Sequence, residues 1–134
     1  MNTNITLLIT RIVFSLSMMT HGYPKLLNLL SDNPSFGNPI GIGEVPTLII
    51  AVLAEFIAPI FIIIGYRTKI FTLLPMITMV IAVFVVHLYD PFKRKELALL
   101  YLVGFLIIFL IRLMLLMMLS TMSSFHPESK LPLA

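Results

Sequence analysis

The sequence predicts an all-α integral membrane protein, a four-helix transmembrane bundle with antiparallel up-down topology. Hydrophobic residues make up 59% of the 134 residues and charged residues only 11%, whereas soluble domains carry about 25% charged residues. The apolar residues gather in four runs, each near the length of about 20 residues that a helix needs to cross a bilayer. Short connections between the later runs indicate that consecutive helices are neighbours that run in opposite directions.

The length and charge of the chain limit what else it can contain. Four spans and their connections use up the 134 residues, so residues 1–134 are predicted to form one membrane domain. The net charge of +3 is scattered except for residues 93–95, which are typical of attraction to lipid headgroups rather than nucleic acid. The absence of cysteine excludes thiol–disulfide chemistry and cysteine-ligated iron–sulfur clusters on this chain.

The first predicted span covers about residues 5–27. At helical spacing, one face of this span is partly polar. It carries Arg11, Ser15, Met18, Gly22 and Lys25, with His21 beside them. Residues 31–44 follow as a loop rich in glycine, proline and asparagine, which is typical of turns.

The second predicted span, residues 45–65, holds a single carboxylate, Glu55, near its middle. An ionised group at that depth costs at least ~2.5–3.5 kcal/mol, so Glu55 needs a charged partner or a polar cavity. Pro59 follows four residues later and has no N–H, so the Glu55 carbonyl loses its usual helical donor. We therefore expect another polar group to meet Glu55 inside the bundle.

The third and fourth spans are predicted over residues 70–89 and 96–121, with a polar tail over 122–134. A turn at residues 90–95 separates the two spans. Helical spacing places a common set of residues on one face of the third span. They are Thr72, Met76, Met79, Val83 and His87.

Counting depth along the spans predicts an ion pair between Arg11 and Glu55. At 1.5 Å per residue, Arg11 lies about 9 Å and Glu55 about 15 Å from the same membrane surface. An arginine side chain can close that gap, and Arg112 falls in the same layer. Two interpretations are compatible: the pair fixes the packing of the first two helices, or it lines a cavity that orients a quinone carbonyl or relays protons.

A second group of ionisable residues is predicted near the opposite surface: His21, Lys25, His87 and Glu96. Two histidines and a carboxylate are nominal metal ligands, and two histidines could also hold haem. These residues are spread over three helices without a diagnostic motif, so we predict no metal. A quinone-head or proton-entry site, or side chains that reach toward the membrane surface, explains them better.

Taken in order, these residues resemble the DoxX family of small four-helix membrane proteins over nearly the whole chain. The matching pieces are Arg11, the run from His21 to Leu26, Glu55, the run from Gly65 to Lys69, His87 and Glu96. Many members close with a Gly-Pro-Gly-like turn after the fourth helix, whereas this chain runs on through Met122. The resemblance implies a subunit of the bacterial inner membrane that passes electrons to quinone, with a partner redox protein carrying out the oxidation.

The predicted function is that of a membrane subunit of a quinone-linked redox complex, with the buried Arg11–Glu55 pair lining a quinone head-group site. The chain would be at most the membrane subunit of a quinone-dependent oxidoreductase, with quinone as its cofactor and with membrane lipids and a redox protein as partners. The candidate site residues are Arg11, Glu55, His21, Lys25, His87 and Glu96. Two alternatives stay open: a small proton-coupled multidrug-type exporter that uses Glu55, and a structural subunit with no site.

Overall fold

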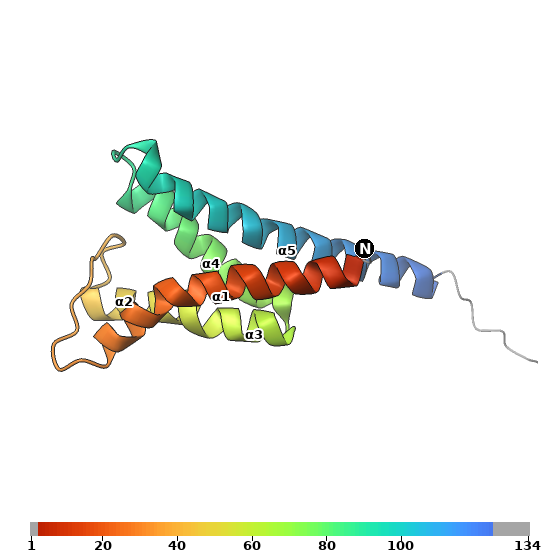
Figure 1. The fold of residues 1–134 in the computed structure, drawn as a ribbon, viewed down its shortest axis with the longest axis horizontal. Helices are drawn as coiled ribbons and strands as arrows, with labels where there is room; N and C mark the ends of the chain where they lie inside the picture. Colours follow the sequence, from red (N-terminus) through yellow and green to blue (C-terminus); the bar gives the residue numbers. More distant parts are fainter. Residues whose placement is uncertain (1–2, 125–134) are drawn as a thin grey trace, which may run out of the picture.

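The computed structural model describes residues 3–124, and all the regular structure in that range is helical (Figure 1). The elements are α1 (Thr3–Leu29), α2 (Glu44–Val52), η1 (Leu53–Ile57), α3 (Ala58–Ile64), α4 (Thr68–Ile81), η2 (Ala82–Val86) and α5 (Phe92–Ser124). Contiguous elements combine into four helices long and apolar enough to cross a membrane. The predicted all-α class and the four spans are therefore confirmed.

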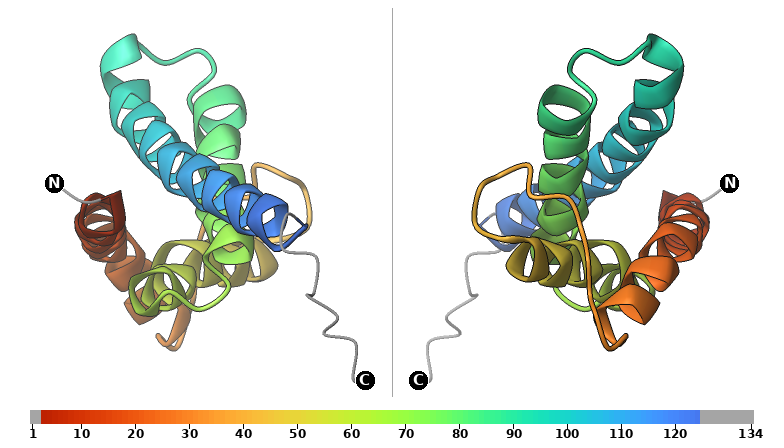
Figure 2. Two further views of the ribbon diagram at one scale, coloured as in Figure 1. Left: turned by 90° about the vertical axis from the view of Figure 1, so that its right-hand side faces the viewer. Right: turned by 90° about the vertical axis from the view of Figure 1, so that its left-hand side faces the viewer.

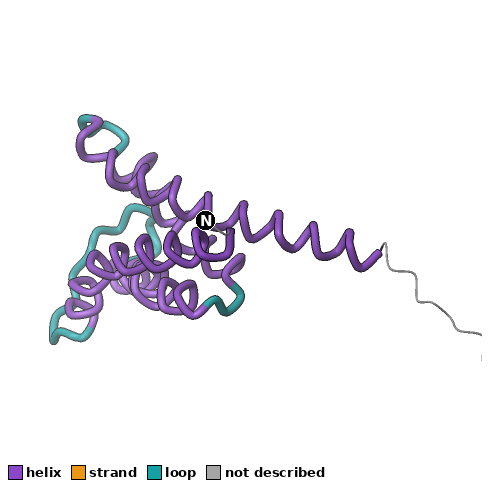
Figure 3. Tube along the Cα trace, turned by 45° about the vertical axis from the view of Figure 1, so that its right-hand side comes forward, coloured by secondary structure: helices purple, strands orange, loops and turns teal. Residues whose placement is uncertain are grey.

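The connections divide the molecule into two ends (Figure 1). Residues 30–43 and 87–91 connect helices at one end, which we call the loop end. Residues 65–67 connect α3 to α4 at the opposite end, the turn end, where α1 also begins. The last turns of α5 extend beyond the other helices at the turn end (Figure 3).

The predicted boundaries hold to within two residues for the first two spans and shift for the others. The third span runs over Thr68–Val86 rather than 70–89. The fourth helix starts at Phe92, directly after Pro91. Residues 92–95, which were predicted to belong to a turn, form the first turn of this helix. This helix continues to Ser124, so residues 122–124 are helical and not part of a tail. The remainder of the predicted tail lies outside the described residues.

Two wide π-helical turns were not predicted. In η1 the N–H of Ala58 bonds to the carbonyl of Leu53, five residues back, and Pro59 then stands in the first turn of α3. In η2 the N–H of His87 bonds to the carbonyl of Ala82 at 2.9 Å. Such turns insert one extra residue into a helix and are frequent at functional sites. Here one of them contains Glu55 and the other ends at His87.

The core confirms the predicted helix faces. On α1, Ser15, Met18 and Gly22 are buried and Lys25 is half-buried. On the third span Thr72, Met79 and Val83 are buried, with Met76 and His87 half-buried. Most of the other large apolar side chains face outward, as expected of helices in contact with lipid.

The helices do not pack evenly along their length. At Gly104 a Cβ atom would lie 2.1 Å from the ring of Phe14, so the missing side chain lets α1 and α5 approach each other there. The Phe14 ring also meets Phe105 edge to face, with centroids 6.4 Å apart. Toward the loop end, the pair α4 and α5 spreads away from α1 and α2 (Figures 1 and 2). The candidate site lies at that end.

Candidate functional site

The site is built on a close contact between α1 and η1. A Cβ atom on Gly22 would lie 2.5 Å from the carbonyl oxygen of Glu55 and 2.9 Å from the amide nitrogen of Phe56. Only glycine allows the two backbones to approach so closely. Lys25 follows three residues later on the same face of α1, so its side chain reaches Glu55 directly.

Lys25 and Glu55 form an ion pair in which the carboxylate is buried and the lysine is partly exposed. The Lys25 Nζ donates to Glu55 Oε1 at 2.5 Å, and Glu55 is only 2% exposed. The Lys25 side chain is 28% exposed and lies 5.6 Å from the centre of the Phe36 ring, a cation–π contact. The carboxylate is thus enclosed, and its lysine partner lies at the edge of the protein.

The connection over residues 30–43 is tied down where it covers Lys25. Asn28 donates from Nδ2 to the Ser35 carbonyl at 2.6 Å, and the Phe36 N–H donates to Glu44 Oε2 at 3.3 Å. These bonds join the end of α1, the connection and the start of α2. They hold the Phe36 ring beside the Lys25 ammonium group.

Two cavities of about 180 Å³ each flank the ion pair. Lys25, Glu55, Ala82 and His87 line both of them. The walls of the first are mainly apolar and include Phe36, Pro39, Ile40, Ile50, Ile81 and Val86. The second is more polar and adds His21, Arg94 and Tyr101. The pair therefore lies between a mainly apolar space and one whose walls are more polar.

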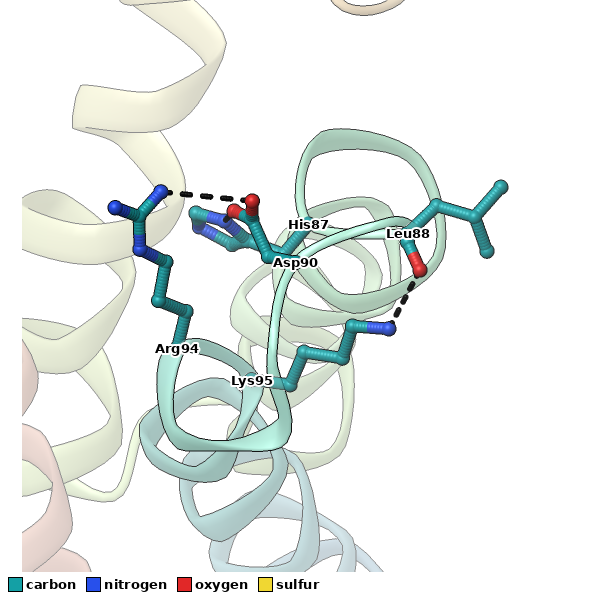
Figure 4. Close-up of polar contacts among 5 residues, drawn as sticks. All are labelled: His87, Leu88, Asp90, Arg94 and Lys95. Carbon is teal, nitrogen blue, oxygen red and sulfur yellow. Dashed lines mark hydrogen bonds and ion pairs between the residues drawn. The ribbon is translucent and has the colours of Figure 1, made fainter.

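His87 is held by the carboxylate of Asp90, in the connection just before the fourth helix (Figure 4). Its Nδ1 lies 2.7 Å from Asp90 Oδ2, and Arg94 Nη1 lies 3.5 Å from the other oxygen of Asp90. The hydrogen bond from His87 is the main reason that the pKa of Asp90 lies below its usual value, and Arg94 lowers it further. With its Nδ1–H bonded to Asp90, a neutral His87 presents Nε2 as a proton acceptor.

The remaining histidine of the site lies against an aromatic ring of α5. The rings of His21 and Tyr101 meet edge to face with centroids 5.6 Å apart. Both residues line the second cavity. His21 and Tyr101, from different helices, thus line the same space as Lys25.

The predicted pair between Arg11 and Glu55 is wrong. Arg11 donates instead from Nε to the Ile62 carbonyl at 2.8 Å and from Nη2 to the Ile63 carbonyl at 2.7 Å. The last carbonyls of a helix lack helical donors and carry partial negative charge, so they attract a cation. The guanidinium also fills the space beside Gly65, where a Cβ would lie 2.7 Å from Nη2.

Four of the six candidate residues come together at the loop end: His21, Lys25, Glu55 and His87. Arg11 lies at the turn end, and Glu96 is exposed on α5 and lines neither cavity. Sequence reasoning missed the roles of Phe36, Asp90, Arg94 and Tyr101. Only Asp90 had a usable signal, since it follows His87 by three residues, a spacing that a tight turn can bridge.

Four helices long and apolar enough to cross a membrane define a multi-pass membrane protein, and its buried carboxylate is paired with Lys25. The family model of DoxX matches residues 6–88, more than half of the chain, and the chain belongs to the DoxX family. The match includes the ion pair and His87 and ends before α5. No curated protein and no solved structure matches the chain.

Proposed function

We propose that this chain is a subunit of the bacterial inner membrane that binds a quinone head group at the loop end and supports its reduction by a partner redox protein. The proposal treats residues 1–134 as one domain whose four spans alternate in direction across the membrane. The observation that carries it is the pair of cavities that share Lys25, Glu55 and His87.

The residues around the cavities fit a quinone head group. Such a group has an apolar ring and two carbonyl oxygens that accept hydrogen bonds. The first cavity supplies apolar walls, and Lys25 supplies a nitrogen donor at its inner side. His87 would supply a second donor there when its Nε2 carries a proton. Membrane ligand sites typically combine a mainly apolar pocket with a few placed polar groups.

The same residues can donate and accept protons. A bound quinone takes up two electrons and two protons, and the electrons would come from the partner protein. Lys25, Glu55 and His87 all exchange protons, and Asp90 fixes the orientation of the His87 ring through Nδ1. Arg94 and His21 add further polar side chains along the second cavity. His87 would hold the proton nearest the head group, and Lys25 would orient a carbonyl oxygen.

Quinone content of the purified protein tests the proposal. Full-length protein is extracted from its membranes in mild detergent, and bound quinone is measured by chromatography. We expect quinone in the wild type, and a loss of about tenfold in Glu55→Gln and His87→Leu, which remove charge-assisted hydrogen bonds. Asp32→Asn, an exposed change in the 30–43 connection, is the matched control. A wild type without quinone, or equal content in all four proteins, would refute the proposal.

Proton-coupled export is the second candidate, because a carboxylate that is 2% exposed lies between two cavities and is held by a titratable amine. In such an exporter a cationic substrate would displace Lys25 from Glu55. Protein in liposomes with an imposed pH gradient would then accumulate lipophilic cations, and Glu55→Gln would abolish the uptake. Absence of uptake together with quinone binding would favour the redox role.

A further inference from the structure

A larger cavity, of about 620 Å³, adjoins the first of the two cavities described above, and we call it the outer cavity. Its lining residues are Phe36, Gly37, Asn38, Pro39, Val85 and Val86. Three of them, Phe36, Pro39 and Val86, also line the first cavity, so the two spaces share a boundary. The 30–43 connection contributes one side of this boundary, and η2 contributes the other (Figure 1).

The chemistry of the walls differs between the two cavities. Lys25, Glu55 and His87 all line the first cavity, whereas none of the described residues that line the outer cavity is titratable. Val86 immediately precedes His87 in the chain, so the apolar wall that continues into the outer cavity ends at the imidazole. A ligand that fills both cavities would therefore have a polar head and an apolar chain.

The volumes of the two cavities favour such a two-part ligand. Pockets that enclose a whole drug-sized ligand measure about 300–1,000 Å³, and the first cavity, at about 180 Å³, is smaller than that. It offers space for a single ring beside Lys25 but not for a long chain attached to the ring. The outer cavity supplies about 620 Å³ directly beside it.

The walls of the outer cavity reach the surface of the membrane spans. Val85 and Val86 are the last residues of the third span, and they are 50% and 52% exposed. Exposed apolar residues at the end of a span lie near the boundary between hydrocarbon and headgroups. On the other side of the cavity, a Cβ atom on Gly37 would have nothing closer than 3.9 Å. A chain can therefore enter this space from the bilayer.

We propose that the outer cavity holds the apolar chain of the quinone whose head group occupies the first cavity, an inference that rests on the function proposed above. The chain would pass between Phe36 and Val86, and the ring would stay beside Lys25 and His87. The ligand class is then narrowed to quinones that carry a long isoprenoid chain, to the exclusion of small water-soluble quinones. Such a ligand would exchange directly with the quinone dissolved in the membrane.

Two quinones that differ only in the chain test the assignment: a benzoquinone with a chain of two isoprene units, and the same benzoquinone without the chain. Their binding to purified full-length protein is measured by native mass spectrometry in one detergent. Val85→Trp adds a large side chain to the outer cavity alone, because Val85 does not line the first cavity. We expect this variant to bind the chain-bearing quinone about tenfold more weakly than the wild type does. Binding of the chainless quinone should be unchanged.

The comparison between proteins has a matched control. Each quinone partitions into the detergent to the same extent in every sample, so the ratio between variant and wild type reports the protein alone. Phe84 also lies in η2, is 58% exposed and lines neither cavity, so Phe84→Trp should bind both quinones as the wild type does. Gly37→Phe fills the outer cavity from the opposite side and should repeat the effect of Val85→Trp.

The outcomes separate the inference from the function on which it rests. A wild type that binds neither quinone would refute the proposed function and the inference with it. Quinone binding that Val85→Trp leaves unchanged, or weakens equally for both ligands, would overturn the inference alone. A copurified phospholipid that Val85→Trp removes while both quinones bind as before would assign the outer cavity to a lipid acyl chain and also overturn it. Unchanged helix content by circular dichroism and an unchanged elution volume show that each variant is folded.

Discussion

The two ends of α1 place a cation on the same helical face, and the two cations meet different acceptors. Near the turn end, Arg11 donates to the backbone carbonyls of Ile62 and Ile63. Near the loop end, Lys25 donates to the side-chain carboxylate of Glu55. Backbone carbonyls cannot titrate and are fixed by their helix, whereas a carboxylate can take up a proton and move.

The two contacts also differ in the space that surrounds the cation. Arg11 packs against Gly65 and lines neither of the two cavities at the loop end. Lys25 lies between two cavities, and His87 lines both of them. Burial of a charged side chain in a membrane helix is therefore not by itself a sign of function: Arg11 closes a helix end, and Lys25 borders a space that a ligand can enter.

The largest expected effect comes from Lys25→Met, which leaves the Glu55 carboxylate buried without a partner. We expect the free energy of unfolding in detergent to fall by about 3 kcal/mol, the loss typical of a broken buried pair. The double variant Lys25→Met with Glu55→Leu should recover most of this loss, because no unpaired charge is left. A double variant as unstable as Lys25→Met would show that the pair does not act as a unit.

A somewhat smaller loss is expected for Gly22→Ala. The added Cβ would meet the Glu55 carbonyl oxygen at 2.5 Å, and both sides of this contact are backbone. Separating α1 from η1 should cost about 2 kcal/mol in unfolding experiments and weaken quinone retention at the same time. Gly37→Ala, in the exposed connection with nothing closer than 3.9 Å, is the control. Equal stability of the two variants would contradict the close packing.

Arg11→Met should destabilise the protein by about 1.5 kcal/mol, because two carbonyl groups lose a charged donor. Bound quinone should not change, since Arg11 lines neither of the cavities at the loop end. Measuring stability and quinone content on the same preparation tests the contrast between the two cations directly. Loss of quinone in Arg11→Met without loss of helix content would remove that contrast.

The smallest effect concerns pH and the His87–Asp90 contact. The pKa of Asp90 is lowered from 3.8, mainly by the hydrogen bond from His87. The ionised carboxylate therefore stabilises the fold above pH 3.8, and this contribution is lost as the pH falls through the lowered folded-state pKa. The thermal midpoint of the wild type should fall in this acidic range by slightly more than that of Asp90→Asn. Parallel curves for the two proteins would argue against the contact.

Helix number and buried faces followed from the sequence, because apolar length and the 3.6-residue period are local properties. The buried face of α1, from Arg11 to Lys25, was predicted correctly. The partner of Glu55 was not, because both cations lie on that face and counting residues gives depth only to within a long side chain. The carbonyls of Ile62 and Ile63 were also overlooked as acceptors. The cover that Phe36 forms over Lys25 depends on the path of a 14-residue connection, which no periodicity encodes.

The wide turn in η1 contains the acceptor of Lys25, which is Glu55, and precedes the acceptors of Arg11, which begin at Ile62. One extra residue rotates everything that follows by about 100° around the helix axis. Deleting a single residue from this turn would therefore leave the first half of the span facing Lys25 and swing the second half away from Arg11. A single irregular turn thus allows both contacts, Lys25 with Glu55 and Arg11 with Ile62, to form between the same two membrane spans.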